Sequence, residues 1–179
     1  MTDISDISSI PVTSECNNIS TKISFQPKSI EKGVGIPSNV NYVAISIPVP
    51  KYRDTDSYIF EVLSHFLRTG FLWNKIRVEG GAYGAGASYD PFAGIFTMTS
   101  YRDPNHVQTI RRFKECVEFL LSDSYTYEDL KDSIIGTIAI LESPLSPRAK
   151  GWVGFQRSLL GITDNERQER KEKILSVKI

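Results

Sequence analysis

The residues best suited to do chemistry are Arg77 and Tyr83, which stand on either side of a short glycine-rich turn. They belong to the run Ile-Arg-Val-Glu-Gly-Gly-Ala-Tyr-Gly of residues 76–84. A guanidinium and a phenolic hydroxyl both donate hydrogen bonds, and together they suit an oxygen that gains negative charge during a reaction. The alternative is structural: Arg77 would be a cation at a helix C-terminus and Tyr83 an ordinary strand aromatic. The residues alone leave both interpretations open.

The histidines argue against a metal site built from this chain. There are two, His65 and His106, and neither lies in H-x-x-E-H or H-E-x-x-H, the spacings that place two histidines and a glutamate on one helix face. His65 stands among apolar residues and is expected to be structural, and His106 is expected to be solvated in the first turn of a helix. We therefore predict no metal ligand and no cofactor in this chain.

The glycines after Arg77 do not match a phosphate-binding loop. A Walker A loop or a dinucleotide fingerprint opens a helix, whereas Gly80, Gly81, Gly84 and Gly86 follow a helical pattern and enter a strand pattern. A G-x-S-x-G nucleophile motif is also missing from the sequence. As a strand, this small-residue segment would let another backbone approach closely.

Two strands and a helix are expected to position Arg77 and Tyr83. Apolar residues alternate over residues 41–49, which predicts a half-buried strand. Residues 95–101 form a second strand pattern after the turn-prone Asp-Pro-Phe-Ala-Gly of residues 90–94. Between these strands, apolar residues recur at helical spacing over residues 59–67, and Gly70 is expected to bend or end that helix. Its N-cap is expected at Asp56 or Ser57.

Four helical patterns follow the second strand. Their start signals are Asp103 with Pro104, Thr126 with Asp129, Ser146 with Pro147, and Thr163 with Glu166. The first has its apolar stripe at Val107, Ile110, Phe113, Cys116, Val117 and Leu120, and the third at Trp152, Phe155 and Leu159. The last is mostly charged and is expected to end near Ile179. Strand, helix, hairpin and then helices predict an α+β fold: an antiparallel or mixed sheet with helices packed on one face.

The chain length suits one domain preceded by a short tail. Residues 1–20 are polar and lack periodicity, so they are expected to be a disordered tail or linker. Residues 21–179 are expected to form the domain, and residues 23–36 have room for two short strands.

Composition excludes several partners. The 21 basic and 21 acidic residues balance, which argues against nucleic acid. We see no apolar run of about 20 residues, the length that spans a membrane. Two cysteines do not make a disulfide framework, so a reducing intracellular compartment is expected.

The chain resembles the C-terminal domain of pitrilysin-type (insulinase-type) zinc metallopeptidases, in the presequence protease branch that includes falcilysin-like enzymes. The likeness rests on Leu-Trp-Asn-Lys-Ile-Arg-Val-Glu-Gly-Gly-Ala-Tyr of residues 72–83 and on Ser-Tyr-Arg-Asp-Pro of residues 100–104. The strand start Val-Asn-Tyr-Val of residues 40–43 is also similar, and the resemblance runs from about residue 33 to about residue 160.

The resemblance implies a function that the residues alone leave open. Members are long chains of four related domains that close around a chamber, and the first domain holds zinc through H-x-x-E-H. The last domain contributes an arginine and a tyrosine, here Arg77 and Tyr83, which act on the scissile carbonyl. Gly80, Gly81, Ala82 and Gly84 would then contact the substrate backbone. Partners would be the remaining domains of the same polypeptide and unstructured peptides, in a mitochondrion or another organelle, and the isolated chain would be inactive.

Two other function classes remain as alternatives. A non-catalytic structural relative, like the core subunits of ubiquinol–cytochrome c reductase, would not need the arginine and tyrosine pair. A free-standing peptide-binding module would use an exposed sheet edge. Surfaces that meet other domains are also expected to leave an exposed apolar patch.

Overall fold

The structure is a computed structural model that describes residues 29–122 and 124–178. The chain divides into two compact units, residues 1–33 and residues 34–179. Residues 29–40 carry neither helix nor strand, so the two short strands predicted within residues 23–36 are wrong for residues 29–36. Residues 23–28 and the predicted tail at residues 1–20 lie outside the described residues.

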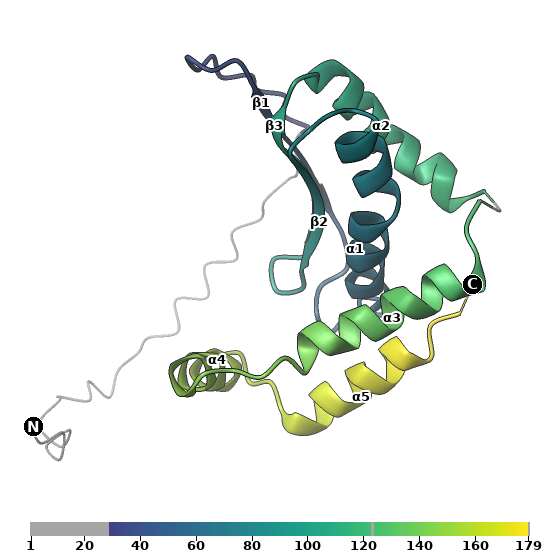
Figure 1. The fold of residues 1–179 in the computed structure, drawn as a ribbon. Helices are drawn as coiled ribbons and strands as arrows, with labels where there is room; N and C mark the ends of the chain where they lie inside the picture. Colours follow the sequence, from purple (N-terminus) through teal and green to yellow (C-terminus); the bar gives the residue numbers. More distant parts are fainter. Residues whose placement is uncertain (1–28, 123, 179) are drawn as a thin grey trace, which may run out of the picture. The chain divides into compact units, whose positions relative to one another are not determined.

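The second part contains three strands and the helices around them (Figure 1). In chain order the elements are β1 (Asn41–Pro48), α1 (Ile59–Thr69), the π-helical η1 (Trp73–Val78), β2 (Gly84–Asp90), β3 (Ile95–Asp103), α2 (His106–Leu120), α3 (Tyr127–Leu141), α4 (Pro147–Leu159) and α5 (Asp164–Leu175). Among the described residues, no helix is long and apolar enough to cross a membrane.

The sheet is antiparallel and has the strand order β1-β3-β2. β2 and β3 form the predicted hairpin, in which Gly84 pairs with Tyr101 and Asp90 with Ile95. The Asp90 carboxylate accepts hydrogen bonds from the Phe92 and Ala93 N–H groups, both at 2.9 Å. Gly94 has φ 68°, a left-handed conformation that favours glycine, so it closes the turn.

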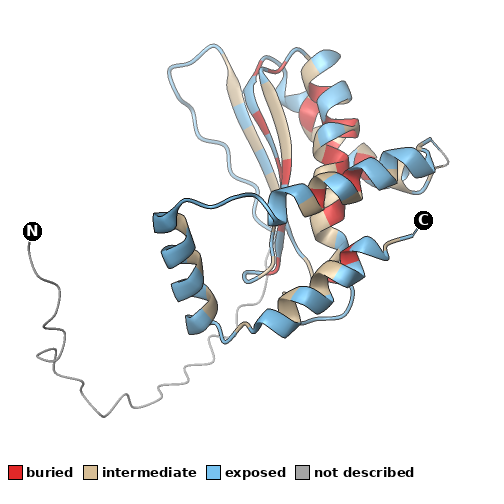
Figure 2. Cartoon of the chain, turned by 60° about the horizontal axis from the view of Figure 1, so that its bottom comes forward, coloured by how far each residue is buried: buried red, intermediate tan, exposed pale blue. Residues whose placement is uncertain are grey.

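One face of the sheet carries the hydrophobic core. Buried side chains alternate along β3 at Phe96 and Met98, because successive strand residues point to opposite faces. They meet side chains from α1, η1 and α2, including Leu67, Ile76 and Phe113. The helices therefore cover this face, as the α+β prediction requires (Figures 1 and 2). On the other face, Tyr42, Ala44, Ser46, Thr99 and Tyr101 are exposed.

Of the last three helices, α3 and α5 pack on α1, whereas α4 is largely exposed. α3 packs against α1, and α5 packs against both α1 and α3 (Figure 1). α4 has no buried residue, which Figure 2 shows as a helix without red. Its predicted apolar stripe is therefore wrong as a core face: Trp152 is 60% exposed, Phe155 58% and Leu159 75%. The stripe of α2 is buried at Phe113 and Cys116, whereas Val107 and Val117 are each 60% exposed.

Helix caps follow the predictions at three of the four late helices. Thr126 with Asp129 and Thr163 with Glu166 form complete capping boxes, and the Ser146 side chain caps α4 ahead of Pro147. α2 differs, because its cap is Asn105 and not Asp103. α1 differs as well: its N-cap is Tyr58, which makes no side-chain cap hydrogen bond, so the prediction of Asp56 or Ser57 is wrong. α5 ends at Leu175, four residues before the predicted end at Ile179.

Candidate functional site

Arg77 lies on η1, directly after the break in the long helix. Gly70 follows α1 with φ −102° and ψ −98°, values outside the helical region, as its predicted helix-ending role requires. The chain then winds into a π-helix, the wider helical form that occurs frequently at functional sites. The Arg77 guanidinium carbon lies 3.9 Å from the centroid of the Trp73 ring. This cation–π contact between residues four apart holds the guanidinium on the helix surface.

The turn after η1 needs its two glycines for local structural reasons. A Cβ on Gly80 would lie 2.6 Å from the Ile76 carbonyl oxygen, and Gly81 has φ +76°. The Gly81 N–H donates to the Arg77 carbonyl oxygen and the Ala82 N–H to the Ile76 carbonyl oxygen, both at 3.1 Å. Ala82 is 3% exposed, so its methyl group packs in the core. These residues therefore form a tight helix stop that carries the chain into β2.

Tyr83 emerges from this turn on the surface. Its side chain is 67% exposed, and its N–H donates to the Arg102 carbonyl oxygen at 3.4 Å. The Tyr83 ring meets the Tyr101 ring edge-on, with centroids 5.8 Å apart, and the Arg102 guanidinium carbon lies 5.8 Å from the Tyr83 centroid. Within the described residues, no hydrogen bond or ring contact joins Arg77 to Tyr83. The structure therefore puts the two at the ends of one turn and gives each a different neighbour.

Three neighbours of this site were not singled out by sequence reasoning: Trp73, Tyr101 and Arg102. Trp73 and Arg77 are four residues apart, a spacing that predicts contact between side chains if the segment is helical. Tyr101 and Arg102 lie in the Ser-Tyr-Arg-Asp-Pro run that marks the family resemblance. Their contact with Tyr83 depends on the register of β2 on β3, which the sequence does not spell out.

Asp103 fixes the end of β3 beside Tyr83. Its side chain is 1% exposed and accepts hydrogen bonds from the Ser100 hydroxyl at 2.7 Å, from the Asn105 N–H at 2.8 Å, and from the Thr109 hydroxyl. The Asn41 amide also donates to the Asp103 carbonyl oxygen at 2.9 Å. Asp103 thereby ties β1, β3 and α2 together at the edge of the site.

The residues that the structure describes do not fit a zinc ion. The part of the chain that the structure describes holds no group of three His, Cys, Asp or Glu residues close enough to bind a metal. His65 packs against α3, and burial is the main cause that lowers its pKa. Cys116 is buried in the core, and burial raises the pKa of its thiol to about 12, so it is not a thiolate ligand at neutral pH.

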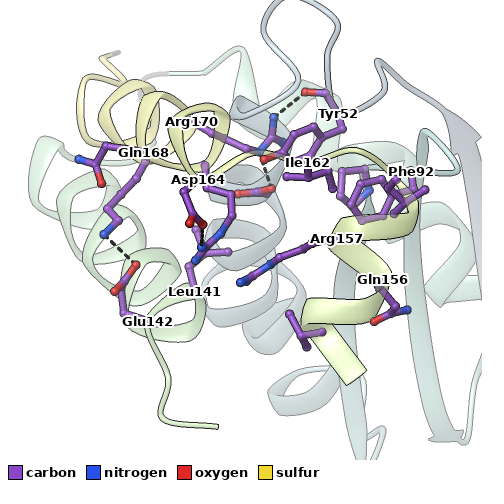
Figure 3. Close-up of a pocket in the computed structure, with 16 residues that line it drawn as sticks. Tyr52, Phe92, Leu141, Glu142, Gln156, Arg157, Ile162, Asp164, Gln168 and Arg170 are labelled. Carbon is purple, nitrogen blue, oxygen red and sulfur yellow. Dashed lines mark hydrogen bonds and ion pairs between the residues drawn. The ribbon is translucent and has the colours of Figure 1, made fainter. Parts of the chain in front are cut away.

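A separate cavity of about 560 Å³ lies among α3, α4, α5 and the β2–β3 turn (Figure 3). Phe92, Leu141 and Ile162 contribute apolar wall, and two ion pairs stand in it at 2.8 Å each, Lys171 with Glu142 and Arg167 with Asp164. Arg157 points into this cavity from α4, and no acceptor for it is found among residues 29–122 and 124–178. None of the site residues predicted from the sequence lines the cavity.

Solved structures share this fold. A protease from Helicobacter pylori aligns with a TM-score of 0.62 and 18% identity over 79% of this chain and 36% of that chain. An inactive domain of an M16 peptidase from Pseudomonas fluorescens aligns with a TM-score of 0.64 and 15% identity over 80% of this chain and 36% of that chain. At this identity the likeness concerns the fold alone.

Curated relatives are closer in sequence and much longer. Presequence protease 1 of Arabidopsis thaliana, described as chloroplastic/mitochondrial, is 38% identical over 151 residues, which are 83% of this chain and 14% of that protein. The mitochondrial presequence protease of Mus musculus is 32% identical over 157 residues, 88% of this chain and 15% of that protein. This chain thus spans about one seventh of their length. A family profile described as the PreP C-terminal domain matches residues 31–179, and the chain belongs to that family.

Proposed function

We propose that this chain is the substrate-binding and transition-state-stabilising domain of a zinc metalloendopeptidase that degrades unstructured peptides. The observation that carries the proposal is the pair of donors at the ends of the η1–β2 turn. Arg77 is held by Trp73 at 3.9 Å, and Tyr83 is 67% exposed with no partner claiming its hydroxyl among the described residues. Family membership supports the same role, since the curated relatives are named presequence proteases.

In this proposal both donors act on the scissile peptide group. The Tyr83 hydroxyl donates a hydrogen bond to the carbonyl oxygen as negative charge builds on it, and the Arg77 guanidinium adds a second, charged donor. Such donors act through their fixed positions, because little reorganisation is then needed during the reaction. The contact with Trp73 and the two-glycine turn supply that rigidity.

The substrate backbone is proposed to run along β2. This strand is an edge of the sheet, since its described partner is β3 alone. A Cβ on Gly84 would meet Tyr101 Cβ at 3.7 Å, which is ordinary contact, so folding does not require a glycine there. The space beside Gly84 suits a peptide backbone that lies close. Gly80, Gly81 and Ala82 contribute by shaping the turn that leads to this edge.

The metal of this proposed enzyme belongs to another part of a longer polypeptide. The stretch of the relatives that this chain matches is only 14–15% of their length, and the described residues do not form a zinc site. The rest of that polypeptide would supply the metal and the attacking water, and would cover the exposed aromatic residues of α4. We accordingly propose that the isolated chain has no hydrolytic activity. An organellar setting follows the relatives, which are named mitochondrial or chloroplastic/mitochondrial.

Variants of the complete polypeptide test the two donors. Arg77→Ala and Tyr83→Phe should each lower peptide turnover by roughly 10²–10³-fold, the usual loss when one oxyanion donor is removed. Arg111→Gln and Tyr127→Phe, at exposed positions on α2 and α3, serve as matched controls and should retain turnover. Unchanged turnover in both Arg77→Ala and Tyr83→Phe, with normal thermal unfolding, would refute the proposed roles.

The role of β2 is tested by a pair of glycine variants. Gly84→Ala should leave the midpoint of thermal unfolding nearly unchanged and should raise the KM for peptide. Gly80→Ala should instead lower the unfolding midpoint, because its methyl group meets the Ile76 carbonyl oxygen. A Gly84→Ala enzyme with wild-type KM would remove β2 from the substrate path.

A further inference from the structure

A row of three exposed tyrosines crosses the open face of the sheet beside the proposed site. Tyr101 stands in the middle, with its ring centroid 5.4 Å from that of Tyr42 and 5.8 Å from that of Tyr83. Both contacts are edge-to-face, at 71° and 66°. The three side chains are 55%, 49% and 67% exposed in the order Tyr42, Tyr101, Tyr83. They come from β1, β3 and the residue before β2, so the row runs across all three strands.

The row faces away from the core. Along β3 the buried residues before Tyr101 are Phe96, Met98 and Ser100, so the alternation turns Tyr101 to the opposite face. Cross-strand aromatic pairs do stabilise sheets, but only by about 0.2–1 kcal/mol per pair. This small gain in stability does not by itself explain three large rings that stay about half exposed on a face that no described helix covers.

Arg102 joins this row through an unusual backbone conformation. It has φ 49°, a left-handed value that is uncommon for a residue other than glycine. The β1–β3 register shifts at the same place, between Asn41 and Val43. The Arg102 side chain therefore lies near the tyrosine row: its guanidinium carbon is 5.8 Å from the Tyr83 ring centroid. No carboxylate pairs with Arg102 within the described part of the chain.

The surrounding hydrogen bonds hold Arg102 in this conformation. The buried Asp103 carboxylate accepts from Ser100, Asn105 and Thr109, and the Asp103 carbonyl oxygen accepts from Asn41. Strained residues persist where neighbouring structure over-determines them, and they cluster at functional sites. The strained backbone at Arg102 therefore suggests that its guanidinium has a binding role.

We propose that Tyr42, Tyr101 and Arg102 form a specificity subsite for the peptide, next to the group on which Tyr83 acts. The tyrosine rings accept an apolar or aromatic substrate side chain, and Arg102 pairs with a carboxylate close to it in the peptide. This inference rests on the proposed function, because it requires a peptide bound at Tyr83. The carboxylate can come from an acidic side chain or from the end of the peptide.

Matched peptides cleaved by the complete polypeptide test the subsite. Each fluorogenic peptide has a Gly/Ser background and carries one Phe followed by Glu or by Gln. The pair is moved along the peptide one position at a time. Every peptide is made with a free and with an amidated C-terminus. At the preferred position the wild-type enzyme should cleave the Glu peptide with a kcat/KM about tenfold above that of the Gln peptide, as expected for a charge-assisted hydrogen bond. If a free C-terminus is instead preferred over an amidated one, with no difference between Glu and Gln, the carboxylate is the peptide end.

Variants separate the subsite from the proposed function. Arg102→Gln should bring the ratio of kcat/KM between carboxylate and amide peptides to about one. Arg102→Lys should keep part of the preference for carboxylate. Tyr101→Leu should reduce the preference for Phe over Ala, whereas Tyr127→Leu should leave that preference unchanged. Thermal unfolding of each variant identifies folding defects, and ratios between peptides cancel any general loss of active enzyme.

The outcomes are distinct. If Arg77→Ala lowers the turnover of every peptide alike while Arg102→Gln leaves the carboxylate ratio intact, the subsite is wrong and the proposed function stands. If the wild-type enzyme shows no carboxylate or aromatic preference at any position, the subsite is also wrong. If Arg77→Ala and Tyr83→Phe have no effect, the proposed function itself fails.

Discussion

Arg170 is the residue that fastens the last helix to the rest of the domain. Its Nε donates to Glu61 on α1 at 2.9 Å, and its Nη1 donates to the Tyr52 carbonyl oxygen at 2.9 Å and to the Ser57 hydroxyl at 2.8 Å. The two charged side chains are 10% and 15% exposed. Burial is the largest cause that raises the pKa of Glu61, and the Arg170 charge opposes it. The carboxylate therefore depends on Arg170 for its charged form.

Removing Arg170 should consequently destabilise the fold. We expect Arg170→Ala to lower the free energy of unfolding by about 3–5 kcal/mol, because it leaves Glu61 buried without its cation. Arg167→Ala, one turn earlier, removes an exposed ion pair with Asp164 and should change stability by less than about 1 kcal/mol. Urea unfolding of both variants makes the comparison. Equal losses in the two would contradict the anchoring role of Arg170.

Glu166 makes the stability of the α4–α5 turn depend on pH. A hydrogen bond from Arg53, followed by one from the Thr163 N–H, lowers the pKa of Glu166 from 4.5 to about 2. Because the folded pKa is below the unfolded one, this contribution is complete above 4.5 and is lost as the pH falls toward 2. Glu166→Gln should flatten the fall of the unfolding midpoint over that pH range, measured by circular dichroism. If the unfolding midpoint of Glu166→Gln falls with pH as steeply as that of the wild type, Glu166 does not contribute to acid destabilisation.

At the scale of elements, the contact of α1 with α3 depends on Gly136, a glycine within α3. A Cβ on Gly136 would lie within van der Waals overlap of the His65 ring, only 2.2 Å from Nε2. The two helices therefore approach closely at this point. Glycine inside α3 has a low helix propensity, and the close approach explains why it stands there.

A double-mutant cycle tests this contact. Gly136→Ala should lower the free energy of unfolding by about 1–3 kcal/mol through overpacking. In a His65→Ala background the same change should cost much less, because the obstructing ring is gone. Gly151→Ala in α4, where nothing lies within 4 Å, is the control and should stabilise the fold by about 0.4–1 kcal/mol. Additive effects of His65→Ala and Gly136→Ala would rule out the steric account.

At the scale of the whole molecule, α4 presents its largest apolar side chains to solvent. Trp152 and Phe155 are 60% and 58% exposed, with ring centroids 5.9 Å apart, and Leu159 is 75% exposed. Spacings of three, four and seven residues place them on one helix face. Val153 of α4 and Leu160, its C-cap residue, line the cavity instead.

The isolated chain should therefore associate through α4. We expect its weight-average mass in sedimentation equilibrium to rise with concentration, and the double variant Trp152→Gln/Phe155→Gln to reduce this rise. Val107→Gln, which changes a residue that is 60% exposed on α2, is the control and should leave association unchanged. A strictly monomeric wild-type chain across the same concentrations would contradict the prediction.

The sequence by itself determined the features that depend on neighbours along the chain. The capping boxes at Thr126 and Thr163 and the β2–β3 hairpin are made by residues a few positions apart, so their side-chain types suffice to predict them. The α+β fold and the family were also read correctly from alternation and from the motifs around residues 72–83 and 100–104.

Only the tertiary structure decided which surfaces are covered and which distant side chains meet. The apolar stripe of α4 has the spacing of a core helix, but burial depends on what packs against it, and the described part of the chain buries no residue of α4. Asp103 was expected to cap α2, yet it is buried among hydroxyl donors from β3 and α2. The contact of Tyr83 with Tyr101 and Arg102 arises from strand register, because residues 18 and 19 positions apart become neighbours only when β2 pairs with β3.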